Sequence, residues 1–189
     1  MDGRSVIFWR RLDMPGHEIA ELMAVDTGWR LAGTALFAHE GRPCRLEYVV
    51  ECDAEWRTRC ARIRGALGRT SIRLDLARND QGHWSANGAA QPAVHGCMDV
   101  DLGFSPSTNL LPIRRLRLAI GSQARVRAAW VRFPELTLEE LDQEYSRLSA
   151  TRYRYESAGG TFERELIVNA TGFVLEYPDF WRVEADTKG

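Results

Sequence analysis

Residues 29–52 read WRLAGTALFAHEGRPCRLEYVVEC, and this stretch decides the fold class of the chain. Apolar or small residues occupy alternate positions over 29–37 and again over 46–52, with a Glu-Gly pair between the two runs at 40–41. A period of two is typical of strands that bury one face, and Glu-Gly is a turn signal. The stretch therefore predicts two strands of an antiparallel sheet.

The same alternation continues along the chain. Residues 69–76 and 125–130 alternate similarly, and a closing strand pair is expected at 162–169 and 173–177. Further turn signals are Asn79-Asp80-Gln81-Gly82, Asn87-Gly88, Gly159-Gly160 and Ala170-Thr171-Gly172. Many strands at close spacing favour a meandering antiparallel sheet, which can curl into a barrel or half-barrel or pack as a sandwich. We predict a mainly β protein with one large antiparallel sheet curled into an open barrel or half-barrel.

One segment, residues 137–148, shows a helical period instead. Its apolar members, spaced by three and four positions, are Leu138, Leu141, Tyr145 and Leu148. Thr137 is a suitable N-cap, and Glu140 follows three residues later, as in a capping box. The pattern predicts one short amphipathic helix near 137–148.

Composition is that of a single folded domain. The chain has 189 residues, of which 44% are hydrophobic and 27% charged, and it contains no internal repeat or linker-like tract. We expect one β domain over 1–189. The 25 basic and 26 acidic residues give a net charge of −1, which argues against nucleic acid as the main partner because phosphate binding needs a basic excess.

The cysteines and histidines do not form a metal-binding pattern. The four cysteines (Cys44, Cys52, Cys60 and Cys97) include no Cys-x-x-Cys pair, and the four histidines are isolated, so we expect free thiols, no metal and no cofactor. The N-terminus carries no apolar signal core, and no run approaches the roughly 20 apolar residues of a membrane span. These features predict a cytoplasmic protein.

Residues 96–116, GCMDVDLGFSPSTNLLPIRRL, carry most of the polar chemistry. In an extended strand Asp99 and Asp101 lie on one face, roughly 6.5–7 Å apart. Such a pair can chelate a hard cation, act as acid and base on a glycosidic bond, or accept hydrogen bonds from sugar hydroxyls. It can also be structural, because Arg115 and Arg117 would alternate on one face of a following strand at 113–120 and pair with both aspartates.

Five further residues are candidate ligand contacts. Thr108 and Asn109 lie in a polar loop that is held by prolines at both ends. Arg114 would end an apolar stripe on the expected strand 113–120, where a charged or sugar head group could dock. Trp56 and Trp84 neighbour turn-rich stretches and are candidate wall residues, although aromatic residues of sheet proteins are more often core.

Several motifs together resemble one family. They are Gly96-Cys97-x-Asp99-Val100-Asp101-Leu102, Ser105-Pro106-x-Thr108-Asn109-x-Leu111-Pro112-Ile113-Arg114-Arg115-Leu116, Asp80-x-Gly82-x-Trp84, Gln143-x-Tyr145 and Gly172-x-Val174-x-x-Tyr177-Pro178. They cover most of the chain and resemble the signature of the bacterial putative glycolipid-binding family. The resemblance implies a half-barrel similar to that of lipoprotein carriers. Ser107 departs from the pattern, since an aromatic residue is usual there, and the carriers' signal peptide is lacking.

Three functions follow from these observations as hypotheses. The first is a binding protein that holds a glycolipid or another amphipathic small molecule in a curled β-sheet cavity without catalysis. The second is a hydrolase that acts on a sugar or lipid conjugate, with Asp99 and Asp101 as acid and base. The third is a non-catalytic interaction scaffold with an exposed sheet edge. We expect the first, with Asp99, Asp101 and Arg114 among the contacts at the cavity mouth.

Overall fold

The structure is a computed structural model that describes residues 4–187. One sheet of 15 strands has the order β8-β7-β6-β5-β4-β3-β2-β1-β15-β14-β13-β12-β11-β10-β9. Neighbouring strands are antiparallel, except that β9 and β10 are parallel. The prediction of a large antiparallel sheet is confirmed, and within the described residues β8 and β9 leave two edges unpaired, so the sheet is curled but not closed.

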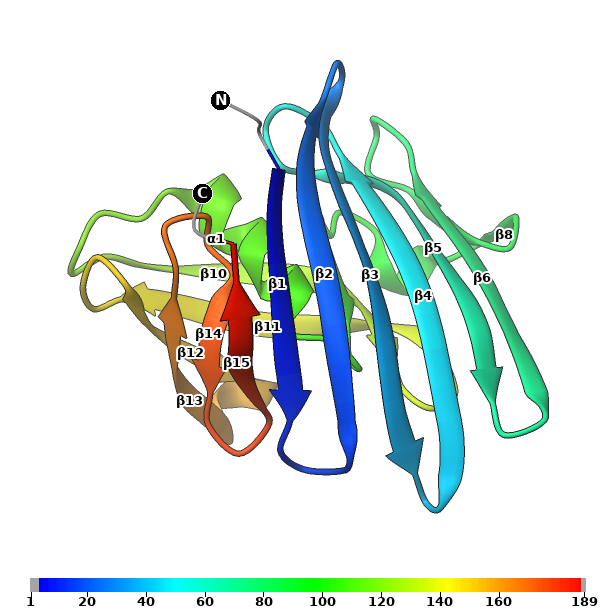
Figure 1. Cartoon of the computed structure of the whole chain (residues 1–189). Coiled ribbons are helices and arrows are strands. Elements are labelled where there is room, and N and C mark those ends of the chain that lie inside the picture. Colours follow the sequence, from blue (N-terminus) through cyan, green and yellow to red (C-terminus); the bar gives the residue numbers. More distant parts are fainter. Residues whose placement is uncertain (1–3, 188–189) are drawn as a thin grey trace.

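Figure 1 shows the two halves of this sheet. The long strands of the first half form a curved layer: β1 (Arg4–Arg11), β2 (Gly16–Val25), β3 (Gly28–His39), β4 (Arg42–Cys52), β5 (Thr58–Leu67) and β6 (Thr70–Arg78), with the short β7 (Trp84–Ala86) and β8 (Ala89–Ala90) at its edge. The second half turns back behind it: β9 (Asp99–Leu102), β10 (Gln123–Arg132), β11 (Thr137–Arg147), β12 (Arg152–Ser157), β13 (Phe162–Val168), β14 (Val174–Tyr177) and β15 (Trp181–Asp186). The short helices are η1 (Pro92–Val94), η2 (Ser107–Asn109), α1 (Leu110–Leu116) and η3 (Ala158–Gly160).

The β3–β4 hairpin forms as its alternation predicts. Trp29 pairs with Cys52 at one end of the ladder and His39 with Arg42 at the other, next to the predicted turn. The inward residues of both strands are buried, as Leu31 and Leu46 illustrate at 1% and 0% exposure. Alternation therefore sets the register, because a slip by one residue would turn these side chains to the outer face.

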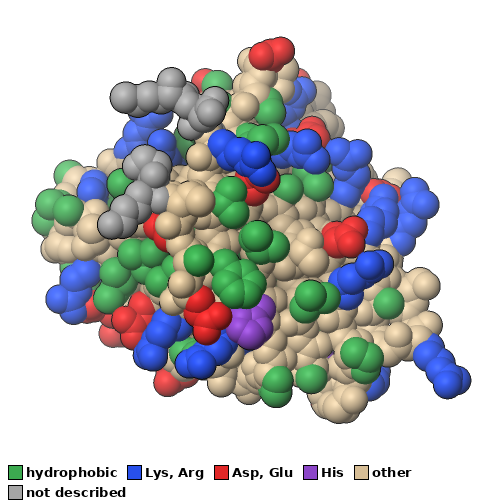
Figure 2. All heavy atoms as spheres, viewed as in Figure 1, with side chains coloured by type: hydrophobic (Ala, Val, Ile, Leu, Met, Phe, Trp, Pro, Cys, Tyr) green, Lys and Arg blue, Asp and Glu red, His purple; other side chains and the backbone are tan. Residues whose placement is uncertain are grey.

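The outer face of the first half is exposed to solvent. Figure 2 shows apolar side chains lying among polar ones on this face, with charged groups gathered toward its borders. Phe8, on β1, stacks on His17 of β2 with ring centroids 5.2 Å apart. No helix in the described part of the chain has the length and apolar character needed to cross a membrane.

The helix predicted near 137–148 is wrong, because residues 137–147 form strand β11. β11 pairs with β10 along its whole length, from Arg132 opposite Thr137 to Gln123 opposite Ser146, and with β12 on its other side. The three-and-four spacing of the leucines is a local signal. The ladder with β10, the shorter ladder with β12 over residues 143–147, and the burial of Tyr145 outweigh it.

The strand predicted at 113–120 is also wrong, because residues 110–116 form α1, the one α-helix of the described chain. Pro112 lies in the first turn, where its missing N–H costs no helical hydrogen bond. The helix ends at Arg117, which adopts a left-handed conformation with φ of 47°. Arg115 and Arg117 therefore do not alternate on a strand, and Arg114 does not end an apolar strand face.

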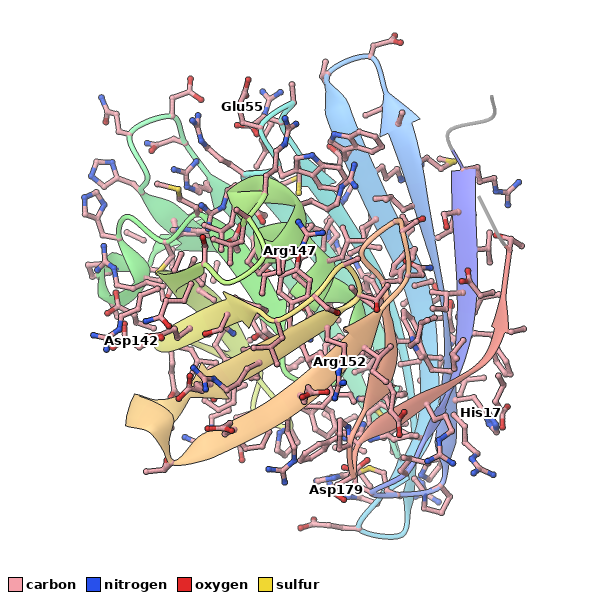
Figure 3. The ribbon with its side chains drawn as sticks, turned by 90° about the vertical axis from the view of Figure 1, so that its left-hand side faces the viewer. His17, Glu55, Asp142, Arg147, Arg152 and Asp179 are labelled. Carbon is pink, nitrogen blue, oxygen red and sulfur yellow. The ribbon has the colours of Figure 1, made fainter. Side chains whose placement is uncertain are left out.

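The central segment, residues 96–116, fills the space between the two halves of the sheet. Its apolar side chains Leu102, Phe104, Leu110 and Leu111 are at most 1% exposed and belong to the main core with the inward residues of β1–β6. Figure 3 shows α1 between the strands of the second half and those of the first. The curled sheet is thus packed around a segment of its own chain.

A buried polar cluster joins this segment to the sheet. The hydroxyls of Tyr48 and Ser105 both donate to Oε1 of Glu18, the former at 2.6 Å, and the Ser107 hydroxyl lies 2.7 Å from that of Tyr48. Oε2 of Glu18 is buried and has no partner in the described residues. Burial raises the pKa of Glu18 from 4.5 to about 7, although the hydrogen bonds from Ser105 and Tyr48 and the nearby charge of Arg11 lower it.

Glu18→Gln is predicted to flatten the dependence of stability on pH. Because the pKa of Glu18 is raised on folding, its contribution is fully present below pH 4.5 and is lost as pH rises through about 7. This loss amounts to about 3 kcal/mol. Glutamine keeps the neutral form, so urea unfolding at pH 4.5 and pH 8 should show the variant equal to the wild type at the lower pH and more stable at the higher one. Parallel pH profiles of the two proteins would contradict the assignment.

Candidate functional site

A cavity of about 420 Å³ lies between the central segment and one end of the second half of the sheet. It is lined by Arg11, Asp13, Asp101, Leu102, Gly103, Ser105, Pro106, Asn109, Trp130, Leu141, Tyr155, Ser157, Ala158, Phe162, Tyr177, Phe180 and Trp181. The turn that carries Asp179, labelled in Figure 3, lies at this end of the molecule. We refer to this space as the aromatic cavity.

One wall of the aromatic cavity is made of rings from four consecutive strands and the turn between the last two. The Tyr177 and Phe180 centroids are 5.3 Å apart, Phe162 and Phe180 are 5.7 Å apart, and Tyr155 and Phe162 are 6.0 Å apart, with the rings tilted or edge to face. Edge-to-face rings hold one another in place and leave some faces open. The wall therefore offers flat apolar surfaces in fixed positions.

Asp101 is one of two acidic residues that line the aromatic cavity, the other being Asp13. Its Oδ2 accepts a hydrogen bond of 2.6 Å from Nε2 of Gln143, which also donates to the Tyr155 hydroxyl at 3.0 Å. Burial raises the pKa of Asp101 to about 6, opposed by the Gln143 hydrogen bond and reinforced by the nearby charge of Asp99. The described residues supply no hydrogen-bond donor to Oδ1, so this oxygen is free to accept a hydrogen bond from a ligand.

Arg11 brings a cation to the opposite side of the aromatic cavity. Its Nε and Nη2 donate to the two carboxylate oxygens of Asp13 at 2.7 and 3.1 Å. The guanidinium lies 4.6 Å from the Phe37 ring centroid and 5.1 Å from that of Trp181, so it is held by rings as well as by a carboxylate. Its Nη1 is buried without a partner among the described residues.

The two aspartates of the central segment have different roles. Nε and Nη2 of Arg115 donate to the two oxygens of Asp99, the first at 3.0 Å, and the Asp99 side chain is 1% exposed. The structural alternative for Asp99, an ion pair with Arg115, is therefore the one observed, although Arg115 comes from α1 and not from a strand, and Asp99 does not line the aromatic cavity as a ligand contact would. Asp101 pairs with Gln143 and not with an arginine, and it alone of the two lines the aromatic cavity.

Of the other five predicted contacts, Asn109 lines the aromatic cavity and four do not: Thr108, Trp84, Trp56 and Arg114. Asn109 is held by the Tyr145 hydroxyl, which donates to its Oδ1 at 2.9 Å. The Thr108 hydroxyl accepts from the Leu102 amide at 3.1 Å, and the Trp84 indole donates to the Cys97 carbonyl at 3.0 Å. Trp56 is 2% exposed. These three side chains are structural in the geometry observed.

Arg114 lies apart from the aromatic cavity. Its guanidinium carbon is 5.0 Å from the Trp56 ring centroid, and its side chain lines a different pocket. The fold therefore separates these four predicted residues of the central segment: Asp101 and Asn109 line the aromatic cavity, Asp99 forms an ion pair, and Arg114 lines another pocket.

Arg11 and the aromatic wall were not predicted from the sequence. The wall residues are dispersed over 155–181, and no local pattern joins them, because the β12–β15 meander brings them together. One available signal was Tyr177-Pro178, which was noted as a motif but not as a site. Within residues 4–187, no group of three or more His, Cys, Asp or Glu side chains is placed to hold a metal ion.

Comparisons with known proteins identify relatives of this chain. The model of a family described as "Putative glycolipid-binding" matches residues 6–183. Among solved structures, the chain is similar to a DUF1089 family protein from Pseudomonas aeruginosa, with 35% identity and a TM-score of 0.76. The similarity covers 85% of this chain and 89% of the other. No protein with a curated description matches.

Arg115→Ala is predicted to destabilise the fold by about 3 kcal/mol, because it leaves the Asp99 carboxylate buried without its partner. The matched control is Arg125→Ala, since Arg125 pairs with Glu144 on the surface and its side chain is 89% exposed. Surface pairs contribute little, so the control should unfold close to the wild type. Equal urea midpoints for the two variants would show that the Asp99 pair does not hold α1 in place.

Proposed function

The chain belongs to the family whose model matches it over residues 6–183, and on that premise we propose that it binds the sugar head group of an amphipathic ligand in the aromatic cavity. The family's description suggests a glycolipid. The cavity volume of about 420 Å³ falls in the range of small-molecule sites, roughly 300–1,000 Å³. Since the central segment fills the curled sheet, the ligand occupies one end of the molecule and not the whole concave face.

The observation that carries the proposal is the pairing of an aromatic wall with Asp101. In a sugar ring, C–H groups cover one or both faces, and these faces pack on aromatic rings. The hydroxyls lie around the edge of the ring and need hydrogen-bond partners. Tyr177 and Phe180 supply the flat surface, and Oδ1 of Asp101 supplies a strong acceptor for a hydroxyl. Nη1 of Arg11 is an unpartnered donor on the far side.

The proposal includes no catalytic step. An acid and base pair would need both carboxylates at one ligand. Arg115 holds the Asp99 carboxylate away from the aromatic cavity, while Asp101 lines it. Binding requires only the Asp101 carboxylate at the ligand, whereas hydrolysis would require a second carboxylate beside it.

We propose a cytoplasmic location as well, on the sequence argument alone.

The first test measures the binding of octyl β-glucoside below its critical micelle concentration. Binding is detected through the fluorescence of Trp130 and Trp181, which line the aromatic cavity. We expect saturable binding that Asp101→Asn weakens roughly tenfold, because a hydrogen bond to a charged group contributes about 1.5–3 kcal/mol. The matched control is Asp142→Asn, since Asp142 is exposed and does not line this cavity. Equal affinities for the two variants would remove Asp101 from the site.

Binding should also depend on pH in a defined direction. The ionised carboxylate is the stronger acceptor, so affinity for octyl β-glucoside should rise as pH increases through about 6, the pKa of Asp101. Asp101→Asn should bind with no such rise. A wild-type affinity that falls over this pH range would contradict the proposed hydrogen bond.

The aromatic wall is tested by Phe180→Ala, which removes one ring at the cavity. Several-fold weaker binding of octyl β-glucoside is expected, because the apolar ring surface is lost. Phe8→Ala is the matched control, since it makes the same truncation on the outer face, where Phe8 stacks on His17. If Phe8→Ala weakens binding and Phe180→Ala does not, the amphiphile binds the outer face of the sheet.

A further inference from the structure

A second pocket, of about 340 Å³, opens where α1 ends and the β13–β14 turn begins. Its lining includes Arg114, Arg117, Arg147, Tyr153, Asn169 and Gly172. None of these lining residues is shared with the aromatic cavity. In Figure 3, Arg147 lies beside α1 and well apart from Asp179, which marks the end of the molecule that holds the aromatic cavity. We refer to the second space as the arginine pocket.

Arg114 is held in the arginine pocket by the Gly172 backbone and by the Trp56 ring. A Cβ on Gly172 would lie 3.3 Å from its Cδ, so the methylenes of Arg114 pack on the bare backbone of the β13–β14 turn. Its guanidinium lies 5.0 Å from the Trp56 ring centroid. Within the described residues the Arg114 N–H groups have neither a hydrogen-bond acceptor nor a carboxylate within 4.0 Å. The Arg114 guanidinium is therefore held in position while its N–H donors make no hydrogen bond within the described residues.

Arg147 is fixed by backbone carbonyls. It donates from Nη1 to Leu118 at 2.7 Å, from Nε to Ser149 at 3.2 Å and from Nη2 to Ala150 at 3.4 Å. Carbonyls orient the guanidinium without neutralising its charge. The guanidinium carbon also lies 5.8 Å from the Tyr153 ring centroid, at the floor of the pocket.

Arg117 completes the group at the C-terminal end of α1. It is exposed, adopts the left-handed conformation that ends the helix, and has no carboxylate within 4.0 Å among residues 4–187. Arg117 and Arg114 line the same pocket, and the charge of Arg117 lowers the pKa of Arg114, with burial as the larger cause. Cations do favour the C-terminal end of a helix, and this accounts for part of the clustering.

The arginine pocket is thus strongly positive. Three arginines line it and no acidic residue does, whereas most arginines of the described chain lie within 4.0 Å of a carboxylate. A nearby acid outside the lining, Asp186, accepts a hydrogen bond of 2.9 Å from the Asn169 amide. The end of a seven-residue helix does not balance three full charges.

We propose that the arginine pocket binds a phosphate monoester group, either free in solution or on a lipid head group. Guanidinium groups present planar forks of N–H donors that match the tetrahedral oxygens of phosphate, and their charge is independent of pH in the ordinary range. Arg114 and Arg117 supply unused donors, and Arg147 supplies a fixed charge. The arginine pocket is separate from the proposed sugar site, so an experiment that contradicts one of the two proposals leaves the other intact.

Isothermal titration calorimetry tests the proposal. The full chain is titrated with inorganic phosphate at low ionic strength. Saturable binding is expected, weakened by added salt, and Arg117→Gln should reduce affinity roughly tenfold through the loss of a charged hydrogen bond. The matched control is Arg69→Gln, since Arg69 is also exposed without a carboxylate within 4.0 Å in residues 4–187. Absence of binding by the wild type, or equal losses in both variants, would overturn the proposal.

A second arm separates the two sources of the phosphate group. Phosphatidylcholine vesicles with and without phosphatidic acid are sedimented with the protein. Binding that requires phosphatidic acid and is lost in Arg117→Gln but not in Arg69→Gln assigns the pocket to a lipid head group. Binding of inorganic phosphate without vesicle binding assigns it to a soluble phosphate ester.

Discussion

The burial of a polar segment inside an open sheet is the constraint on which the rest of the structure depends. Residues 96–116 fill the curl of the sheet, so their polar groups must find partners in the protein. Glu18 and Tyr48 bind the two serines of the segment, and Arg115 neutralises Asp99. These contacts fix where the segment enters and leaves the interior. The aromatic cavity lies beside residues 101–109 of this segment, and the arginine pocket lies beside residues 113–117 at its C-terminal end.

This arrangement differs from that of a carrier whose concave face is empty. Here residues 96–116 of the chain occupy the concave face of the sheet. The proposed ligand space is the aromatic cavity, between this segment and the β12–β15 meander. The same segment contributes Asp101 to the floor of one space and Arg114 to the wall of the other. The proposal of a sugar site in the aromatic cavity takes its ligand class from the family's description, "Putative glycolipid-binding".

The sheet was predictable from sequence because alternation is a local property of each strand, as in residues 29–52. The element types at 113–120 and 137–148 were not, because a proline-containing helix and a strand with helical spacing are decided by what packs against them. The Asp99–Arg115 pair could be predicted from complementary charge, even with the wrong element for Arg115. The aromatic wall could not, because Tyr155 and Phe180 meet only through the meander.

The central claim is that a sugar head group lies against the aromatic wall with a hydroxyl on Asp101. Nuclear Overhauser contacts between octyl β-glucoside and the assigned protein test it most directly, since they locate the ligand without relying on a variant. We expect contacts from the glucose ring protons to the Tyr177 and Phe180 rings, which line the aromatic cavity. Contacts confined to Phe8 and the outer face of β1 and β2, or no saturable contacts at all, would contradict the account.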